Sequence, residues 1–283
     1  MSTTRAQPDN YVVIGNPIAH SKSPAIHARF AELTAQAIDY QRLLAPLDSF
    51  VATVQTFIAS GGKGANVTVP FKLEAFTLAT ELTPRAQAAG AVNTLKFDNG
   101  NILGDNTDGI GLVTDIIHNA GYSLRGKRVV LLGAGGAARG ALLPLLQEQP
   151  AQLLIANRTV SRAQELLALA QEMSNGIDLQ ACRFEDLQGS ADIIINATSA
   201  SLHDDVPPFS PTLFSPQTLA YDMMYAAQPT AFLRLASSHG AQCRDGLGML
   251  VEQAAAAFAL WRGVRPQTTI VLADMRVAMQ ARS

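Results

Sequence analysis

Residues 129–140, VVLLGAGGAARG, join a run of apolar residues to a glycine-rich segment. The apolar run is typical of a buried strand, and the residues after the glycines favour a helix. Gly133, Gly135 and Ala138 have the G-x-G-x-x-A spacing. The first glycine permits a tight turn, the second lets the backbone approach a pyrophosphate, and the alanine allows close packing of helix on strand. The stretch predicts a dinucleotide-binding βαβ unit; a glycine turn kept only for packing is the alternative.

The end of the next predicted strand indicates which dinucleotide is bound. An NAD site usually places a carboxylate there, which binds the ribose 2′-OH. In LLIANRTVSR, residues 153–162, the strand ends at Asn157 and is followed by Arg158 and Arg162. Two guanidinium groups can clamp a 2′-phosphate, and no carboxylate repels it. NADP is therefore favoured over NAD; solvated ends of an ordinary helix are the alternative for the arginines.

The pattern around this unit predicts an α/β fold with two domains. As far as residue 245, short apolar segments alternate with helix-period segments, as in a parallel sheet covered on both faces. Upstream, strand–helix units are combined with a hairpin around an Asp-Asn-Gly turn at residues 98–100. We expect an N-terminal α/β substrate-binding domain over 1–108 and a Rossmann-like, doubly wound NADP-binding domain over 109–245. Two C-terminal helices, within 246–283, are expected to pack back on the first domain; a position that bridges the two domains is the alternative.

Composition limits the class of protein further. The chain has 283 residues, of which 48% are hydrophobic, and 21 basic against 23 acidic residues give a formal charge of −2. This balance disfavours nucleic-acid and anionic-membrane partners. Cys182 and Cys243 match no metal spacing and are typical of reduced thiols. No apolar signal core precedes residue 11, and the apolar runs are too short to span a bilayer. We expect a soluble, cytoplasmic protein with no metal; a monomer and a homodimer both stay open.

Polar residues in the first domain stand out at three places. In HSKSPAIH, residues 20–27, Ser23 is the expected N-cap of a helix that Pro24 begins, which leaves the hydroxyl of Ser21 unexplained. His20 and His27 show no ligand spacing and are expected to be surface or capping residues.

In NVTVPFK, residues 66–72, Asn66 and Thr68 are two apart on a strand and so face the same side. Lys72 begins the next helix, where a cation opposes the helix dipole, which indicates function rather than stability. In GDNTDG, residues 104–109, Asp108 lies at the expected domain junction. A lysine ammonium can protonate the alkoxide that hydride transfer to a ketone leaves, and a carboxylate can hold that lysine. Lys72 and Asp108 could form such a pair; solvated surface charges are the alternative.

Together these segments resemble shikimate dehydrogenases, over about residues 11–260. The matching motifs occur in the family's order: SKSPAIH, NVTVPFK, GAVNTL, GDNTDG, GAGGAARG, NRT, NATS, DMMY and DGLGMLVEQAA. The resemblance implies a two-domain enzyme that reduces 3-dehydroshikimate to shikimate with NADPH, on the route to chorismate and aromatic amino acids. The rivals are a quinate dehydrogenase that uses NAD, and a dinucleotide-binding regulatory protein without turnover.

The resemblance also implies roles for individual residues. Ser21 and Ser23 bind the substrate carboxylate, and Lys72 is the catalytic acid–base, paired with Asp108. The ring hydroxyls are held by Asn66, Thr68, Asn93, Asp108 and Gln253, with Tyr225 nearby. The cofactor is bound by Gly133, Gly135, Gly136, Ala137, Asn157, Arg158, Thr159, Arg162, Thr198, Met223, Gly246 and Met249. The chain departs from the family after NATS, where its loop sequence is its own.

Overall fold

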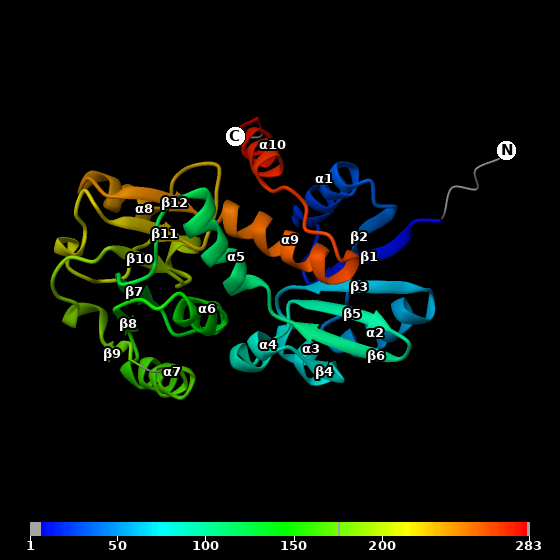
Figure 1. Ribbon diagram of the computed structural model, residues 1–283, viewed down its shortest axis with the longest axis horizontal. Helices are drawn as coiled ribbons and strands as arrows, with labels where there is room; N and C mark the ends of the chain where they lie inside the picture. Colours follow the sequence, from blue (N-terminus) through cyan, green and yellow to red (C-terminus); the bar gives the residue numbers. More distant parts are fainter. Residues whose placement is uncertain (1–6, 175, 282–283) are drawn as a thin grey trace. The chain divides into compact units, whose positions relative to one another are not determined.

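A computed structural model describes residues 7–174 and 176–281 and divides into two compact units (Figure 1). Unit 1 takes the residues up to Thr107 together with Gln253–Ala273. Unit 2 takes Asp108–Glu252 together with the residues from Asp274 onward. The α/β class predicted from the sequence is confirmed. No helix in the described part of the chain is long and apolar enough to cross a membrane.

Unit 1 is built on a mixed six-stranded sheet in the order β2-β1-β3-β5-β6-β4. Strand β1 pairs in parallel with β2 and β3, and the predicted hairpin β5–β6 joins the sheet antiparallel to β3. Two short elements, β4 and α4, were not expected. The elements are β1 (Asp9–Gly15), α1 (Ser23–Thr34), β2 (Ile38–Leu44), α2 (Phe50–Ala59), β3 (Gly62–Val67), α3 (Lys72–Leu78), β4 (Glu81–Leu82), α4 (Pro84–Ala89), β5 (Thr94–Asp98) and β6 (Asn101–Asp105).

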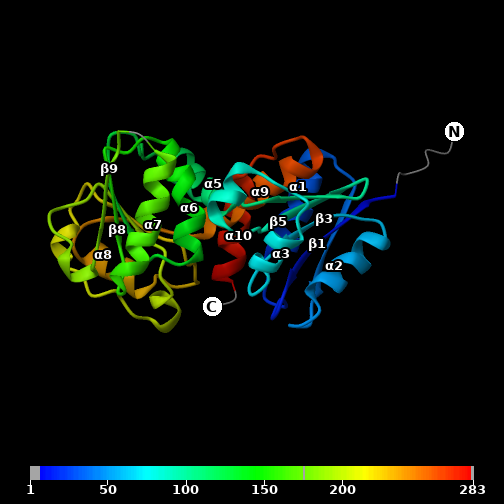
Figure 2. The same cartoon turned by 90° about the horizontal axis from the view of Figure 1, so that it is seen from below.

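Alternate residues of β1 divide the core of unit 1 between the two faces of the sheet. Val12 and Ile14 pack with residues of α2 and α3. Tyr11 and Val13 pack on the opposite face, with Trp261 of the C-terminal helix α9 (Leu247–Arg262). The sheet of unit 1 is therefore covered on both sides by helices (Figure 2).

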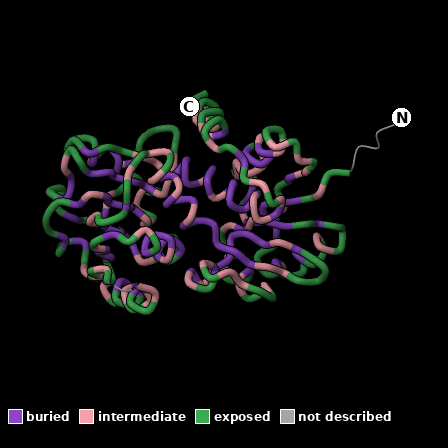
Figure 3. Tube along the Cα trace, viewed as in Figure 1, coloured by how far each residue is buried: buried purple, intermediate pink, exposed green. Residues whose placement is uncertain are grey.

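Unit 2 contains an all-parallel sheet in the order β12-β11-β10-β7-β8-β9. This is the Rossmann order. The order of the strands reverses between β7 and β10, which leaves a crevice at the carboxyl ends of these two strands. The central strands β7, β10 and β11 are almost wholly buried (Figure 3). The elements are α5 (Asp108–Thr114), β7 (Arg128–Leu132), α6 (Gly136–Gln147), β8 (Gln152–Ala156), α7 (Val160–Met173), β9 (Asp178–Cys182), β10 (Ile193–Asn196), β11 (Leu219–Asp222), α8 (Ala231–Ser238) and β12 (Gln242–Asp245).

The C-terminal helices differ from the expectation that all of 246–283 belongs with the first domain. The boundary between the units falls inside α9, at Glu252 and Gln253. Helix α10 (Thr269–Gln280) begins in unit 1, but Arg276 binds Asp245 with two hydrogen bonds of 2.6 Å. This ion pair ties the end of α10 to β12 and explains why the residues from Asp274 onward group with unit 2.

One helix departs from regular geometry. Helix α5 continues from Asp115 to Asn119 as a π-helix, which the sequence did not indicate. Gly121 follows with a φ of +74°, the left-handed conformation expected of a residue that ends a helix. The helix therefore changes type before it ends ahead of Gly121.

Candidate functional site

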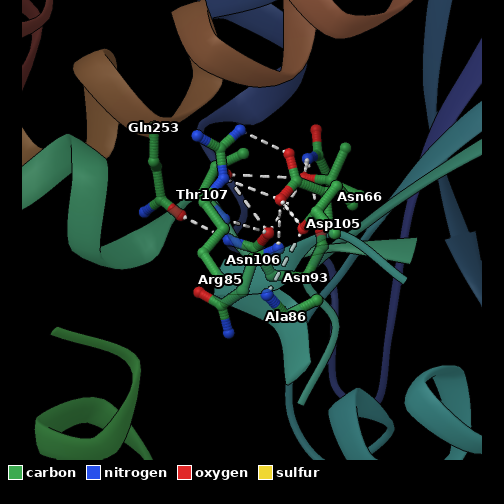
Figure 4. A network of polar contacts seen from close by, with 10 residues as sticks. Asn66, Arg85, Ala86, Asn93, Asp105, Asn106, Thr107 and Gln253 are labelled. Carbon is green, nitrogen blue, oxygen red and sulfur yellow. Dashed lines mark hydrogen bonds and ion pairs between the residues drawn. The ribbon is translucent and has the colours of Figure 1, made fainter. Parts of the chain in front are cut away.

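Three strand ends bring the predicted substrate-binding residues of unit 1 to one edge of its sheet. Asn66 near the end of β3 lies opposite Thr94 at the start of β5, and Thr94 lies opposite Asp105 at the end of β6. Antiparallel pairing thus places the NVT, VNT and DNT segments beside each other although they are far apart in the sequence. Figure 4 shows the polar side chains that meet there.

Asn93 is the centre of this cluster and is 4% exposed. Its Oδ1 accepts hydrogen bonds from the backbone N–H of Thr107 at 2.9 Å and from the Thr94 hydroxyl at 2.9 Å. Its Nδ2 donates to Gln253 Oε1 at 3.1 Å. Two of the predicted substrate ligands, Asn93 and Gln253, are therefore in direct contact within unit 1.

Helix α9 supplies Gln253, and two contacts further along the helix fix it to unit 1. The indole N–H of Trp261 donates to Leu95 O at 2.9 Å. The guanidinium of Arg262 forms an ion pair with Asp9. These contacts at the end of the helix hold Gln253 against the start of β5.

Asn66 is held from two sides. The Tyr40 hydroxyl donates to Asn66 Oδ1 at 2.7 Å, and Asn66 Nδ2 donates to Thr94 Oγ1 at 3.1 Å. Thr68 does not lie on the strand with Asn66, as the sequence predicted, because β3 ends at Val67. The Thr68 N–H still donates to Ile14 O at 2.9 Å, so the extended direction continues past the strand.

The two aspartates of GDNTDG have different environments. Asp105 is fully buried and accepts two hydrogen bonds from Arg85, at 2.7 and 2.5 Å, and one from Thr83 at 2.6 Å. These bonds tie the end of β6 to α4, so Asp105 has a structural role. Asp108 is the first residue of α5 and of unit 2, and it is 9% exposed.

The serine pair corrects one prediction. The N-cap position of α1 is Lys22, not Ser23, and the backbone N–H of Ser23 donates to Ser21 Oγ at 3.3 Å. The helix therefore begins one residue earlier than Pro24 and has no side-chain N-cap, although Ser21 Oγ accepts the N–H of its first residue. Arg42 of β2 also donates to Ser21 O, at 3.1 and 2.6 Å, which brings positive charge to the serine segment.

Lys72 lies where the sequence placed it, as the first residue of α3. Its carbonyl oxygen accepts the N–H of Val92 at 3.0 Å, one residue before Asn93. The start of α3 is thereby tied to the segment that carries the substrate-binding cluster.

The prediction for His27 is wrong, because the side chain is fully buried. Its ring stacks on Tyr40, with centroids 4.2 Å apart and planes 6° apart, and it also contacts the rings of Phe30, Phe258 and Trp261. Neither ring nitrogen has a hydrogen-bond partner. Burial among aromatic rings lowers the pKa of His27 to about 3. His20 is exposed, as expected.

Eight of the twelve predicted nucleotide residues line a cavity of about 620 Å³ in unit 2. Gly133 ends β7 with a φ of +105°, and a Cβ there would lie 3.2 Å from the backbone of Ala197. The turn therefore needs glycine, both for its conformation and for the approach of β7 to β10. Cβ atoms at Gly135 and Gly136 would meet nothing within 4 Å, so the start of α6 is open toward the cavity. Ala138 is buried in the core, as predicted.

The wall of this cavity also carries the residues predicted to select NADP. Asn157 follows β8, and its Nδ2 donates to Thr159 O at 2.8 Å. Arg158 and Arg162 are exposed and line the cavity, whereas Thr159 does not. A bare helix N-terminus and two guanidinium groups suit the pyrophosphate and the 2′-phosphate of NADP. The donor set present therefore fits this cofactor.

A chain of side-chain hydrogen bonds fixes Thr198, another residue that lines the cavity. Asn196 Oδ1 accepts from the Thr198 hydroxyl at 2.7 Å, and Asn196 Nδ2 donates to Ser201 Oγ at 3.1 Å. Ser201 and Thr230 each donate to Asp222 Oδ2 at 2.6 Å. Thr198 lines the cavity and is thus fixed through β10 to the end of β11.

The last three predicted cofactor residues do not line the cavity: Met223 follows β11, Gly246 follows β12, and Met249 lies in α9. A Cβ on Gly246 would lie 2.1 Å from Met223 O, so only glycine fits beside Met223. Met249 is buried in the same core to which Met223 packs. Tyr225 is half-buried in unit 2, and burial together with the charge of Asp245 raises its pKa.

Several residues of these sites were not predicted from the sequence: Tyr40, Thr94, Thr107 and Asp222. Thr94, Thr107 and Asp222 carried a signal, because each lies at a strand end or beside a predicted ligand, whereas Tyr40 lies inside β2 and carried none. Their partners were not visible, since hydrogen bonds between distant segments leave no spacing pattern.

Comparisons with known proteins match almost the whole chain. Residues 13–95 match the shikimate dehydrogenase substrate binding domain, 115–203 the shikimate / quinate 5-dehydrogenase family, and 246–275 the shikimate 5′-dehydrogenase C-terminal domain. A shikimate dehydrogenase (NADP(+)) of Herminiimonas arsenicoxydans is 65% identical over 271 residues, 96% of this chain and 98% of that relative.

Solved structures agree with this match. An Ael1 enzyme from Pseudomonas putida has a TM-score of 0.89 and 52% identity, over 94% of this chain and 97% of that one. A shikimate 5-dehydrogenase from Thermus thermophilus, solved with NADP(H) and shikimate, has a TM-score of 0.84 and 31% identity, over 95% and 99%. The chain therefore belongs to the shikimate dehydrogenase family.

Proposed function

We propose that this protein is an NADP-dependent oxidoreductase that reversibly reduces 3-dehydroshikimate to shikimate. The observation that carries the proposal is the cluster of amides and hydroxyls around Asn93, which suits a ring with several hydroxyl groups. A site built to pair hydroxyls rejects analogues that lack them, because its own polar groups would then stay unsatisfied. The Thermus thermophilus relative, which was solved with shikimate and NADP(H), supports this choice of substrate and cofactor.

The substrate ligands in this proposal are the residues that the family resemblance names. Ser21 and Ser23 bind the carboxylate, which has two oxygens for two neutral donors beside the N-terminus of α1. Arg42, bound to Ser21 O, adds favourable charge to that end. The ring hydroxyls are bound by Asn66, Thr68, Asn93, Asp108 and Gln253, with Tyr225 nearby.

Lys72 is proposed as the acid–base group. When NADPH is bound, it supplies the hydride, and the oxygen that was the ketone then needs a proton. The Lys72 ammonium gives that proton and takes it back in the reverse direction. Asp108 is proposed to orient Lys72; the aspartate follows directly after Thr107, whose N–H is bound to Asn93. The placement of Lys72 at the start of a helix supports a functional role, since it is unfavourable for stability.

The nucleotide ligands in this proposal follow the cavity of unit 2. The open N–H groups at the start of α6, after Gly135, receive the pyrophosphate. Arg158 and Arg162 receive the 2′-phosphate, and Thr198 lies on the opposite wall of the same cavity. Thr159, Met223, Gly246 and Met249 are proposed from the resemblance as further contacts.

One experiment tests the whole assignment. The purified protein is given shikimate or quinate with NADP or NAD, in all four combinations, and reduced nicotinamide is followed by fluorescence. Turnover should be fastest with shikimate and NADP. Turnover with quinate and NAD and silence with shikimate would transfer the protein to the quinate-dependent branch of its family. We also propose a cytoplasmic location, in keeping with its two free cysteines, and a monomer or homodimer, which light scattering measures directly.

A further inference from the structure

Tyr40 is in contact with the proposed substrate ligand Asn66, and the proposed function gives it no role. It belongs to β2, is 6% exposed, and its hydroxyl lies 2.7 Å from Asn66 Oδ1. Burial raises the pKa of Tyr40 well above its usual range, and a hydrogen bond with Ser23 opposes this shift. The same phenol therefore touches one residue proposed for the carboxylate and one proposed for a ring hydroxyl.

The hydrogen-bond chain fixes which way each group must face. The N–H of Thr107 can only donate, so the Asn93 atom 2.9 Å from it is the oxygen. The Thr94 hydroxyl, 2.9 Å from the same oxygen, uses its one proton there and must accept from its other neighbour.

That neighbour is Asn66, which therefore presents Nδ2 to Thr94 at 3.1 Å and turns Oδ1 toward Tyr40. The Tyr40 hydroxyl is then the donor that satisfies Asn66 Oδ1. Without it, Asn66 Oδ1 would lose this donor, and the carboxamide would be held only through Nδ2, which faces Thr94 Oγ1 and, at 3.4 Å, Asn93 O.

His27 keeps the phenol in place. Its ring lies parallel to the Tyr40 ring at 4.2 Å, and Trp261 lies 6.2 Å from the same ring. The near-parallel planes make its contact with Tyr40 a packing of ring faces, and the Asn66 side chain lies close enough to His27 to act on its pKa. The stacked rings of His27 and Tyr40 thus fix the position of the hydroxyl that binds Asn66.

We propose that Tyr40 is a positioning residue, whose hydroxyl holds the Asn66 carboxamide with Nδ2 toward Thr94 and so keeps it ready for a substrate hydroxyl. The inference rests on the proposed function of Asn66 as a substrate ligand. It assigns no chemical step to Tyr40, which acts only through Asn66.

The variant Tyr40→Phe removes the hydroxyl and keeps the ring on His27. We expect the KM for shikimate to rise about three- to tenfold, with kcat and the KM for NADP within about twofold of the wild type. The matched control is Tyr11→Phe, in the same aromatic cluster. The Tyr11 hydroxyl accepts one long hydrogen bond, from Arg262 at 3.4 Å, and contacts no proposed ligand. This control should leave all three constants unchanged.

A double-mutant cycle with Asn66→Ala shows whether Tyr40 acts through Asn66. Adding Tyr40→Phe to Asn66→Ala should change the KM for shikimate no further. If Tyr40→Phe caused the same loss with the wild-type Asn66 and in the Asn66→Ala variant, the proposal would be overturned, as it would by an unchanged KM in the single variant. If Tyr40→Phe raised the KM for shikimate and the KM for NADP alike and lowered the Tm, Tyr40 would be an ordinary core residue, and the proposal would also be overturned.

A measurement without substrate separates this inference from the proposed function. In the ligand-free protein, Tyr40→Phe should move the side-chain amide resonance of Asn66 in a ¹H–¹⁵N spectrum, and Tyr11→Phe should not. An unmoved resonance overturns the positioning role whatever the enzyme turns over. If the resonance moves while the wild type is inactive on shikimate, the proposed substrate fails and the link between Tyr40 and Asn66 stands.

Discussion

Replacing His27 by phenylalanine tests how the aromatic cluster of unit 1 responds to acid. The buried imidazole has a pKa of about 3, against about 6.5 for an unfolded chain. The unfolded state therefore binds a proton that the folded state refuses, so stability falls as the pH drops below about 7 and continues to fall toward pH 3. A phenylalanine fills the same stack without a titrating group.

The size of the effect follows from these two pKa values. At pH 7 the imidazole destabilises the fold by about 0.2 kcal/mol, and at pH 5 by about 2 kcal/mol. The value at pH 5 depends almost entirely on the unfolded pKa, because the folded protein binds almost no proton there. The stability of the wild type should thus fall by about 2 kcal/mol more than that of His27→Phe between pH 7 and pH 5.

Urea unfolding at pH 7, 6 and 5 measures this difference. Trp261, the single tryptophan of the chain, lies 5.3 Å from His27 between ring centroids, so its fluorescence reports on this unit. Any packing cost of phenylalanine is the same at each pH and cancels in the slope. Tyr40→Phe is the control, because it alters the same cluster without removing a group that titrates below pH 7. Parallel pH profiles for wild type and His27→Phe would show that the buried, neutral imidazole is a wrong description.

Three further substitutions test the proposed site. Lys72→Ala should lower kcat by about 100-fold or more while shikimate still binds, as equilibrium titration can measure; a loss of binding with kcat intact would remove Lys72 from the proton transfer. Arg158→Ala should raise the KM for NADP by about tenfold and the KM for NAD much less, and equal changes would refute the 2′-phosphate clamp. Ser21→Ala should weaken shikimate binding and also reduce stability by up to about 1 kcal/mol, since its hydroxyl accepts the N–H of Ser23 at the start of α1. A stability loss with unchanged KM would leave Ser21 with the structural role alone.

Much of the fold was predictable because its signals are local. The glycine turn at residue 133, the hairpin around Asn99 and Gly100, and the alternation of strand and helix in unit 2 all depend on neighbouring residues. Short elements were missed where the pattern is too brief to read, as for β4 with its two residues. The π-helix after Thr114 has no periodic signature of its own.

The site was predictable to the extent that a motif carries it. The motifs led to Asn66, Asn93 and Gln253, which the structure joins in one cluster. Burial was not predictable in the same way. His27 has the pattern of a helix-surface residue in its own segment, and it is covered by Tyr40 of β2 and by α9, which is more than 200 residues away in the sequence. The predicted N-cap, Ser23, was wrong by one residue, because the helical conformation already begins at Lys22, whose side chain gives no capping signal.

The hydrogen bond from the Thr107 main chain to Asn93 has a consequence for how this site can evolve. Every residue type except proline carries that N–H, so this hydrogen bond to the central amide does not depend on the side chain at position 107. An aspartate at position 93 would still accept this bond but could no longer donate to Gln253. Substitutions that shift substrate preference are therefore more readily tolerated at Gln253 and Tyr40, the two ends of this hydrogen-bond network, than at Asn93 in its centre. In a lineage that changed its substrate, we expect Asn93 to be retained and Gln253 and Tyr40 to be substituted.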